Sequence, residues 1–298
     1  MTENREIKSG VFADLFCDDE KDGKKNFLSL YNALHGTDLK LEETTLERQR
    51  IPQSLYKTFY NDISVVVNGK LIVLVEHQST PNENMPLRFL EYYVHLLYGI
   101  VPADARYKKN RCKIPAPEFF VFYNGDEKQE GERILRLSDA FVERQDEPAC
   151  EVVVKFSNIG GTVGENLRVV KNCDILKQYC DFMEIIARHR ALMKKNPTGA
   201  DARGCYEQAI SEAISKNILA DYLSRKSTEV KNMFIGEYDY DTDVRVQREE
   251  AAEQRAINSA KNLLAMNVLT PEQIAQAVGL SLEQVLELQK EAQASVTA

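Results

Sequence analysis

Residues 61–80 read Asn-Asp-Ile-Ser-Val-Val-Val-Asn-Gly-Lys-Leu-Ile-Val-Leu-Val-Glu-His-Gln-Ser-Thr, and this stretch decides the fold. Its two apolar runs are rich in Val and Ile, and Asn68-Gly69 between them is typical of a β-hairpin turn. The polar side chains gather at the open end of the hairpin. There, Asp62 begins the first strand and Glu76-His77-Gln78 finishes the second.

The register of the hairpin decides whether these polar side chains lie together. Side chains alternate between the faces of a sheet, so a slip of one residue reverses all of them. A two-residue turn would set Asp62 opposite Val75, whereas a three-residue connection or a bulge would pair Val67 with Leu71 and set Asp62 opposite Glu76. We predict the second register. The residues that then share one face are Asp62, Ser64, Glu76 and Gln78.

Two carboxylates opposite each other on neighbouring strands repel unless a cation lies between them. Hard oxygen ligands suit Mg²⁺ or Mn²⁺, so Asp62 and Glu76 are candidate metal ligands. Such a metal would bind a phosphate oxygen and make an attacking water more acidic. The amide of Gln78 could orient that water but not deprotonate it. The alternative is a strand end that carries ordinary polar residues.

Several motifs resemble one group of nucleases. An Asp before a hairpin that ends in Glu-X-Gln looks like the metal site of the PD-(D/E)XK nuclease superfamily, with Gln78 in place of the usual Lys. A closer similarity is to the recombination-promoting nuclease (Rpn) family, also described as YhgA-like transposases. The resemblance extends from about Val11 to Glu237. The motifs that carry it are Tyr60-Asn61-Asp62, Leu74–Thr80, Asn84–Arg88, Phe120–Gly125 and Leu137–Phe141.

This resemblance implies an α/β restriction-endonuclease-like core, with a mixed sheet flanked by helices and a helical C-terminal extension. It also implies Mg²⁺-dependent (or Mn²⁺-dependent) cleavage of DNA, with a role in recombination or transposition. Asp62, Glu76 and Gln78 would form the catalytic site. The family's first-helix acid is absent, because Ser9 and Ala13 stand at its positions. Asp14 or Glu20 could replace it, although a solvated face suits each better. The alternative is a catalytically inactive relative that binds DNA or protein.

The composition limits the partners and the compartment. No stretch of about 18 apolar residues exists, so we expect no membrane contact. The six Cys show no Cys-X-X-Cys spacing, which favours buried or half-buried thiols in the cytoplasm. A net charge of −8 counts against nucleic acid unless basic residues gather around one cleft. The candidate DNA contacts are Arg88, Lys108, Lys109 and Arg111, although solvated charges or surface salt bridges would explain them as well.

We predict a nuclease-like domain over residues 1–238, helical from about 166, and a helical appendage over 239–298 that begins at the acidic break 239–243. In the appendage, capping boxes at Thr270 and Ser281 start two helices in a helix-turn-helix outline. Its acidic second helix favours homo-oligomerisation or partner binding over DNA binding. The other expected elements are helices at 10–34 (with a charged loop at 18–25), 84–100, 166–195, 206–223 and 230–235, a turn-helix at 135–142, and strands at 44–48, 118–123 and 150–156.

Overall fold

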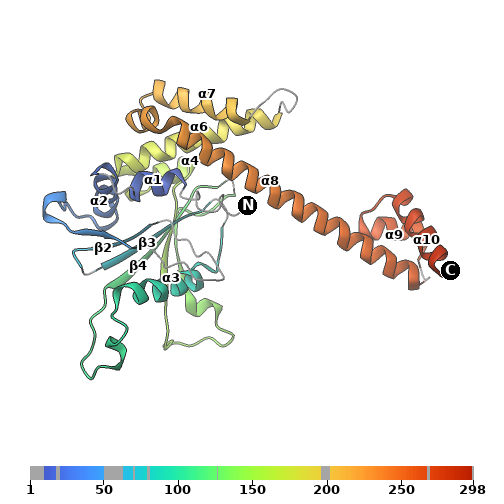
Figure 1. Ribbon diagram of the computed structural model, residues 1–298, viewed down its shortest axis with the longest axis horizontal. Helices are drawn as coiled ribbons and strands as arrows, with labels where there is room; N and C mark the ends of the chain where they lie inside the picture. The colour runs from blue at the N-terminus through green and yellow to red at the C-terminus, as the bar shows by residue number, and fades with distance from the viewer. Residues whose placement is uncertain are drawn as a thin grey trace. The chain divides into compact units, whose positions relative to one another are not determined.

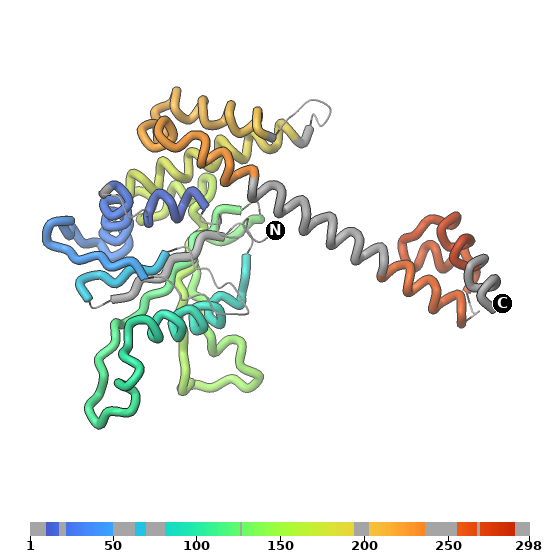
Figure 2. Tube along the Cα trace, viewed as in Figure 1, coloured from blue at the N-terminus to red at the C-terminus, as the bar shows by residue number. Residues whose placement is uncertain are grey.

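In the computed structural model, the described residues are 10–17, 21–49, 63–69, 71–78, 81–125, 127–195, 202–266 and 269–296 (Figure 2). For residues 21, 71–78, 194–195, 202, 236–254 and 290–296 the description covers the backbone alone. The chain divides into two compact units, Met1–Phe234 and Ile235–Ala298. None of the described helices is long and apolar enough to cross a membrane.

The first unit is built on a mixed sheet with strand order β1-β2-β3-β4-β6-β5 (Figure 1). Strands β3, β4 and β6 are parallel to one another, while β1, β2 and β5 pair antiparallel to their neighbours. The predicted α/β class is therefore confirmed. The strand bounds are β1 Leu46–Arg48, β2 Ile63–Val67, β3 Leu71–Gln78, β4 Ala116–Tyr123, β5 Glu132–Arg136 and β6 Val153–Asn158.

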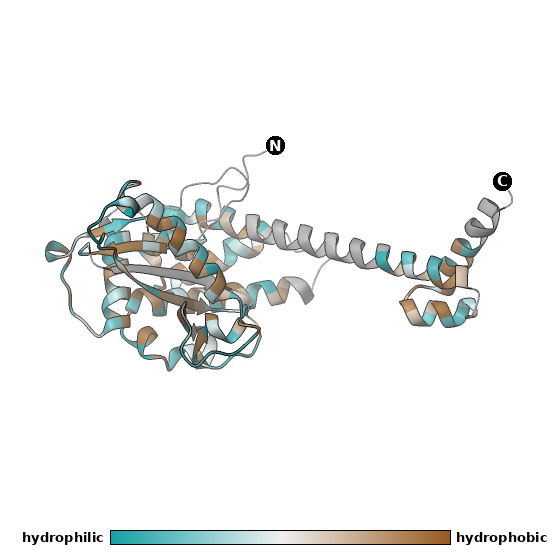
Figure 3. Ribbon diagram, turned by 90° about the horizontal axis from the view of Figure 1, so that it is seen from below, coloured by the Kyte–Doolittle hydropathy of each residue, from teal (hydrophilic) through white to brown (hydrophobic). Residues whose placement is uncertain are grey.

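The β2–β3 hairpin has the predicted register. Val67 pairs with Leu71 at its closed end, and Ile63 pairs with Val75 toward its open end. Asn68 and Gly69 take positive φ angles of 52° and 65°, a conformation that Asn and Gly tolerate better than other residues. The strand-rich centre of this unit is predominantly hydrophobic (Figure 3).

Helix α3 (Met85–Ile100), the helix predicted at 84–100, covers one face of the sheet (Figure 1). Asn84 lies at its N-cap position, but its side chain makes no capping hydrogen bond. The sequence pattern predicts an inner face of Leu87, Leu90, Tyr93, Val94 and Leu97. This is wrong for Leu87 and Val94, which are 57% and 42% exposed, whereas Leu90 and Tyr93 are half-buried against the core. The stripe about 100° around the helix faces inward instead, and it presents larger rings to the sheet. The buried residues of α3 are Met85, Pro86, Phe89, Tyr92 and Leu96.

Helices α1 (Val11–Cys17), α2 (Lys21–His35) and α6 (Asp174–Lys195) lie over the other face. The ring centroid of Phe12 in α1 lies 5.9 Å from that of Phe122 in β4 and 5.4 Å from that of Tyr179 in α6. Helix α1 therefore joins the sheet to the helical half. The predicted loop at 18–25 is wrong for residues 21–25, which begin α2. The remaining helices of this half are α4 Gly161–Glu165, α5 Arg168–Lys171, α7 Ala202–Ser215 and the start of α8 Ala220–Met266.

Three short 3-10 helices and one unpredicted strand complete the unit. The predicted turn-helix at 135–142 is correct for η3 (Leu137–Ala140), but residues 132–136 form β5. This strand lies at the edge of the described sheet, where charged residues face solvent. Its charged sequence gave no strand signal. The other two are η1 (Leu41–Glu43) and η2 (Ala105–Tyr107).

The acidic segment 239–243 does not interrupt the secondary structure, because α8 continues through it to Met266, although the two units divide nearby, between Phe234 and Ile235. Helices α9 (Pro271–Val278) and α10 (Leu282–Val296) follow, and both predicted capping boxes are confirmed. Thr270 and Ser281 each exchange hydrogen bonds with the Gln three residues later. The unit has its own small core, which consists of Ala260, Ile274, Ala275 and Val285.

Candidate functional site

The carboxyl ends of β3, β4 and β6 meet at one edge of the sheet, where ligands bind in open α/β folds. Here Glu76 pairs with Val121 and Gln78 pairs with Tyr123. Asp62 lies outside the described residues, and the side chains of β3 are not described. The meeting of Asp62, Glu76 and Gln78 therefore stays a prediction, although the register on which it depends is confirmed.

Polar groups at this edge are tied into the fold. The Tyr123 hydroxyl donates to the carbonyl of Glu127 at 3.0 Å and accepts from its N–H at 2.9 Å. The Asn158 amide donates to the carbonyl of Gln129 at 3.1 Å, and its Oδ1 accepts from Gly160 N–H at 3.1 Å. Tyr123 is fully buried, so it belongs to the core and not to a reactive site. These contacts fix the loops that frame the edge.

Arg133 is a cation at this edge that sequence reasoning missed. It pairs with Phe156, which in turn pairs with Val121, so it lies in the same row across the sheet as Glu76. Its guanidinium lies 4.5 Å from the centroid of the Phe156 ring, and Nη1 contacts Glu83 Oε1 at 2.8 Å. Both Nε and Nη2 are buried and have no hydrogen-bond partner within the described chain. These two atoms form the side of the guanidinium that binds carboxylates and phosphates in two-point fashion.

Arg88 lies in the first turn of α3, near this edge in sequence, but its guanidinium turns back onto its own helix. Nε and Nη2 donate to the Tyr92 hydroxyl at 3.1 and 2.6 Å, and Nη1 contacts Met85 Sδ at 3.4 Å. The side chain is half-buried. These contacts of Arg88 all lie within α3.

The other predicted DNA contacts, Lys108, Lys109 and Arg111, lie at the opposite edge of the sheet. They precede β4, whose first residue, Ala116, pairs with Leu71 at the start of β3. At about 3.3 Å per residue, Leu71 and Gln78 are about 23 Å apart. The structure therefore does not bring these basic residues together with Glu76 and Gln78.

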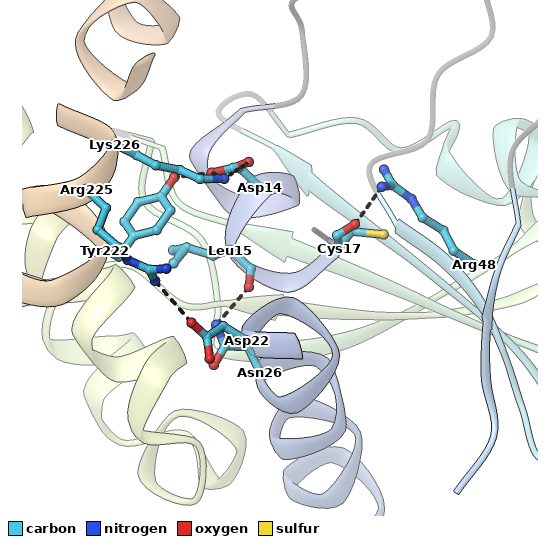
Figure 4. Close-up of polar contacts among 9 residues, drawn as sticks. All are labelled: Asp14, Leu15, Cys17, Asp22, Asn26, Arg48, Tyr222, Arg225 and Lys226. Atoms are coloured by element: carbon cyan, nitrogen blue, oxygen red, sulfur yellow. Dashed lines mark hydrogen bonds and ion pairs between the residues drawn. The ribbon is translucent and has the colours of Figure 1, made fainter. Parts of the chain in front are cut away.

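The proposed substitutes for the first-helix acid have different outcomes. Asp14 of α1 is half-buried and binds Lys226 Nζ at 3.0 and 3.2 Å and the Tyr222 hydroxyl at 2.6 Å (Figure 4). Its expected solvated position is therefore wrong. Lys226 is also the point where α8 departs from helical geometry (φ −116°, ψ 21°). Glu20 lies outside the described residues.

A polar cavity of about 340 Å³ lies beside this ion pair, between α1, α2, α6 and α8. Its charges are matched, because Arg225 contacts Asp22 at 3.1 Å in addition to the pair at Asp14 (Figure 4). Asn26 donates to the Leu15 carbonyl at 2.9 Å and joins α2 to α1. The ion pairs that line this cavity hold α8 against α1 and α2.

The cysteines differ in part from the prediction. Cys112 and Cys150 are exposed, whereas Cys17, Cys173 and Cys205 are buried. Burial raises the pKa of the Cys180 thiol to about 12. Among the described residues, no group of three or more His, Cys, Asp or Glu could hold a metal ion.

Comparisons of the chain with protein-family models, with curated proteins and with solved structures found no match. The resemblance to the Rpn family therefore rests on the sequence motifs alone.

Proposed function

We propose that this protein is a Mg²⁺-dependent DNA endonuclease with a PD-(D/E)XK-like core, similar to the Rpn family. The β2–β3 register carries the proposal. Glu76 follows Val75, and Asp62 precedes the partner of Val75, Ile63. Pairing that continued by one residue would set the two carboxylates opposite each other. The other register would have sent them to different faces of the sheet.

The donors proposed for the metal fit Mg²⁺ or Mn²⁺ by chemistry, because carboxylate oxygens are the hard ligands that both ions prefer. Asp62 and Glu76 would hold the ion. When bound, it would polarise a phosphate oxygen and acidify a water. The Gln78 amide would orient a water molecule by hydrogen bonding, since it cannot accept its proton.

Arg133 supports the proposal from the same edge of the sheet. Cleavage of DNA requires a cation that holds the phosphodiester in place, and two buried N–H groups of Arg133 lack partners within the described chain. Glu83 and the Phe156 ring hold the guanidinium in position. We assign Arg133 to phosphate binding at the proposed cleavage site, from which Lys108, Lys109 and Arg111 are distant.

The test is nicking of supercoiled plasmid by the purified chain with Mg²⁺, Mn²⁺ or EDTA. We expect metal-dependent nicking that falls more than about 100-fold in Asp62→Ala, since loss of even an outer-shell partner of a metal costs 10- to 100-fold. Gln78→Ala should also slow nicking. Glu47→Ala removes an exposed carboxylate from β1 and should leave the rate unchanged. Nicking that survives Asp62→Ala would contradict the proposal.

A second candidate is a nuclease-like fold that binds DNA or protein without cutting. The observation that favours it is the commitment of Asp14 to Lys226 and Tyr222, which leaves α1 without an available described acid. Metal binding separates the two candidates, because a ligand that binds only the folded state raises its melting temperature. A nuclease should be stabilised by Mn²⁺, and Asp62→Ala should lose that stabilisation. The absence of both nicking and metal-induced stabilisation would support the binding module.

A further inference from the structure

The segment before β4 concentrates positive charge on an acidic protein. Between residues 104 and 113 it carries five basic side chains and one acidic one, whereas the whole chain has a net charge of −8. Every basic side chain in this segment is exposed. We call residues 104–114 the basic loop. Its basic residues are Arg106, Lys108, Lys109, Arg111 and Lys113.

Two tyrosines accompany these charges and are open to solvent. Tyr107 in the basic loop is 86% exposed, and Tyr98 near the end of α3 is 57% exposed. The Arg106 guanidinium lies 5.2 Å from the centroid of the Tyr98 ring. Exposed aromatic rings between basic side chains are the surface on which the bases of a single nucleic-acid strand stack while its phosphates meet cations.

The basic loop is held in shape at both ends. Ala105 is buried and begins the 3-10 turn η2, and Lys108 contacts Asp104 across this turn at 2.7 Å. At the other end, the Tyr93 hydroxyl of α3 donates to the Pro115 carbonyl at 3.2 Å. The fold thus presents Tyr107 at a fixed place, which reduces the entropy lost on binding.

We infer that the basic loop binds single-stranded nucleic acid, with bases stacked on Tyr107 and Tyr98 and phosphates bound by Lys108, Lys109 and Arg111. The loop lies at the opposite edge of the sheet from the proposed catalytic residues, so it is a separate contact. As a second DNA contact of a nuclease it rests on the proposed function, but the binding itself requires no cleavage.

The first experiment compares three 15-nucleotide ligands by fluorescence anisotropy in EDTA: oligo-dT, an abasic strand and a duplex. Because stacking contributes about 1–3 kcal/mol per base, Tyr107→Ala should weaken oligo-dT binding roughly 5- to 150-fold. It should change abasic-strand binding little. Val142→Ala, at a fully exposed apolar residue of another loop, is the control and should have no effect.

The second experiment uses two native thiols. Cys112 in the basic loop and Cys150 in another loop are both exposed, so a maleimide should label both in the free protein. Bound oligo-dT should slow labelling of Cys112 and leave Cys150 unchanged. Binding of oligo-dT no tighter than that of the abasic strand or the duplex, no effect of Tyr107→Ala, or equal protection of both thiols would overturn the inference. Asp62→Ala should bind like the parent chain, so failure of the nuclease proposal would not affect this result.

Discussion

At the carboxyl ends of the parallel strands the connections are packed against the sheet, whereas at the amino ends they extend into solvent. After β6, Gly164 packs so closely against Ile159 that its position has no space for one added methyl group. Before β4, Tyr107 is 86% exposed, and in the loop before β6 Val142 is fully exposed. A site for chemistry needs rigid support, and a surface for binding a flexible strand needs accessible side chains. The two ends of the sheet match these different demands.

The largest effect should follow from Gly164→Ala at the packed end. A Cβ there would lie 2.0 Å from the Ile159 carbonyl oxygen, and backbone cannot move aside cheaply. We expect a loss of about 3 kcal/mol or more in unfolding free energy, measured by urea denaturation. Gly204→Ala in α7 is the control, because no atom lies within 4 Å of its Cβ position. It should be neutral or stabilising by up to about 1 kcal/mol. Equal stabilities of the two variants would contradict tight packing at this end.

The elements of the fold differ in how well the sequence predicts them. The β2–β3 hairpin follows from the Asn-Gly turn and the two apolar runs, but the turn alone does not select the register, because a two-residue turn would give the other one; the predicted pairing of Val67 with Leu71 is confirmed. Strand β5 was missed because its sequence, Glu-Arg-Ile-Leu-Arg, places two adjacent apolar residues between charges and so lacks the alternation that is typical of a strand. The inner face of α3 was wrong in part because apolar residues cover most of the helix circumference outside Arg88, Glu91 and His95, so periodicity alone could not select the buried stripe.

The candidate site was less predictable than the fold. Arg133 and Glu76 are far apart in sequence and come into one row only through β4 and β6. Likewise, Lys108 precedes a strand parallel to β3, a pairing that sends it to the far edge and that no local motif specifies. Chemistry at a strand end can be inferred from the sequence, but neighbours across a parallel sheet depend on the order of the strands.

Arg133→Met should have an intermediate effect on stability, and it tests the end of the sheet where the proposed catalytic residues lie. It removes two buried N–H groups that lack partners, so stability should stay unchanged or rise by up to about 1 kcal/mol while plasmid nicking falls. The control is Arg136→Met at the other end of β5. Arg136 is 51% exposed and lies 3.7 Å from Glu151, so we expect a change under about 0.5 kcal/mol and unaltered nicking. Strong destabilisation by Arg133→Met would mean that the guanidinium stabilises the folded state, and this would contradict its assignment to phosphate binding.

Glu151 provides a pH test at the amino ends of the parallel strands, where its carboxylate binds the first turn of η3. Its carboxylate accepts from the Ser138 hydroxyl at 2.7 Å and from the backbone N–H groups of Ser138 and Val152, and these hydrogen bonds lower its pKa. A lowered folded-state pKa stabilises the protein above the unfolded value of about 4.3, and this stabilisation is lost as the pH falls below it. Glu151→Gln should therefore melt lower than the parent at pH 7, and the difference should shrink by pH 3. A pH-independent difference would contradict this explanation.

The smallest effect on stability should come from Lys108→Met. Both members of its ion pair with Asp104 are more than half exposed, at 61% and 66%, so the stability should change by less than about 0.5 kcal/mol. Binding of oligo-dT should nevertheless weaken, and the slope of log affinity against log salt should fall by about 0.7, the value for one released phosphate contact on a single strand. Lys40→Met is a matched control, because Lys40 contacts Asp38 at 2.8 Å with similar exposure but lies outside the basic loop. It should change neither quantity. An equal effect of both variants on binding would mean that total charge, not the basic loop, attracts the strand. A change in binding confined to Lys108→Met would show that the charges of the basic loop, at the amino ends of the strands, serve binding and not folding.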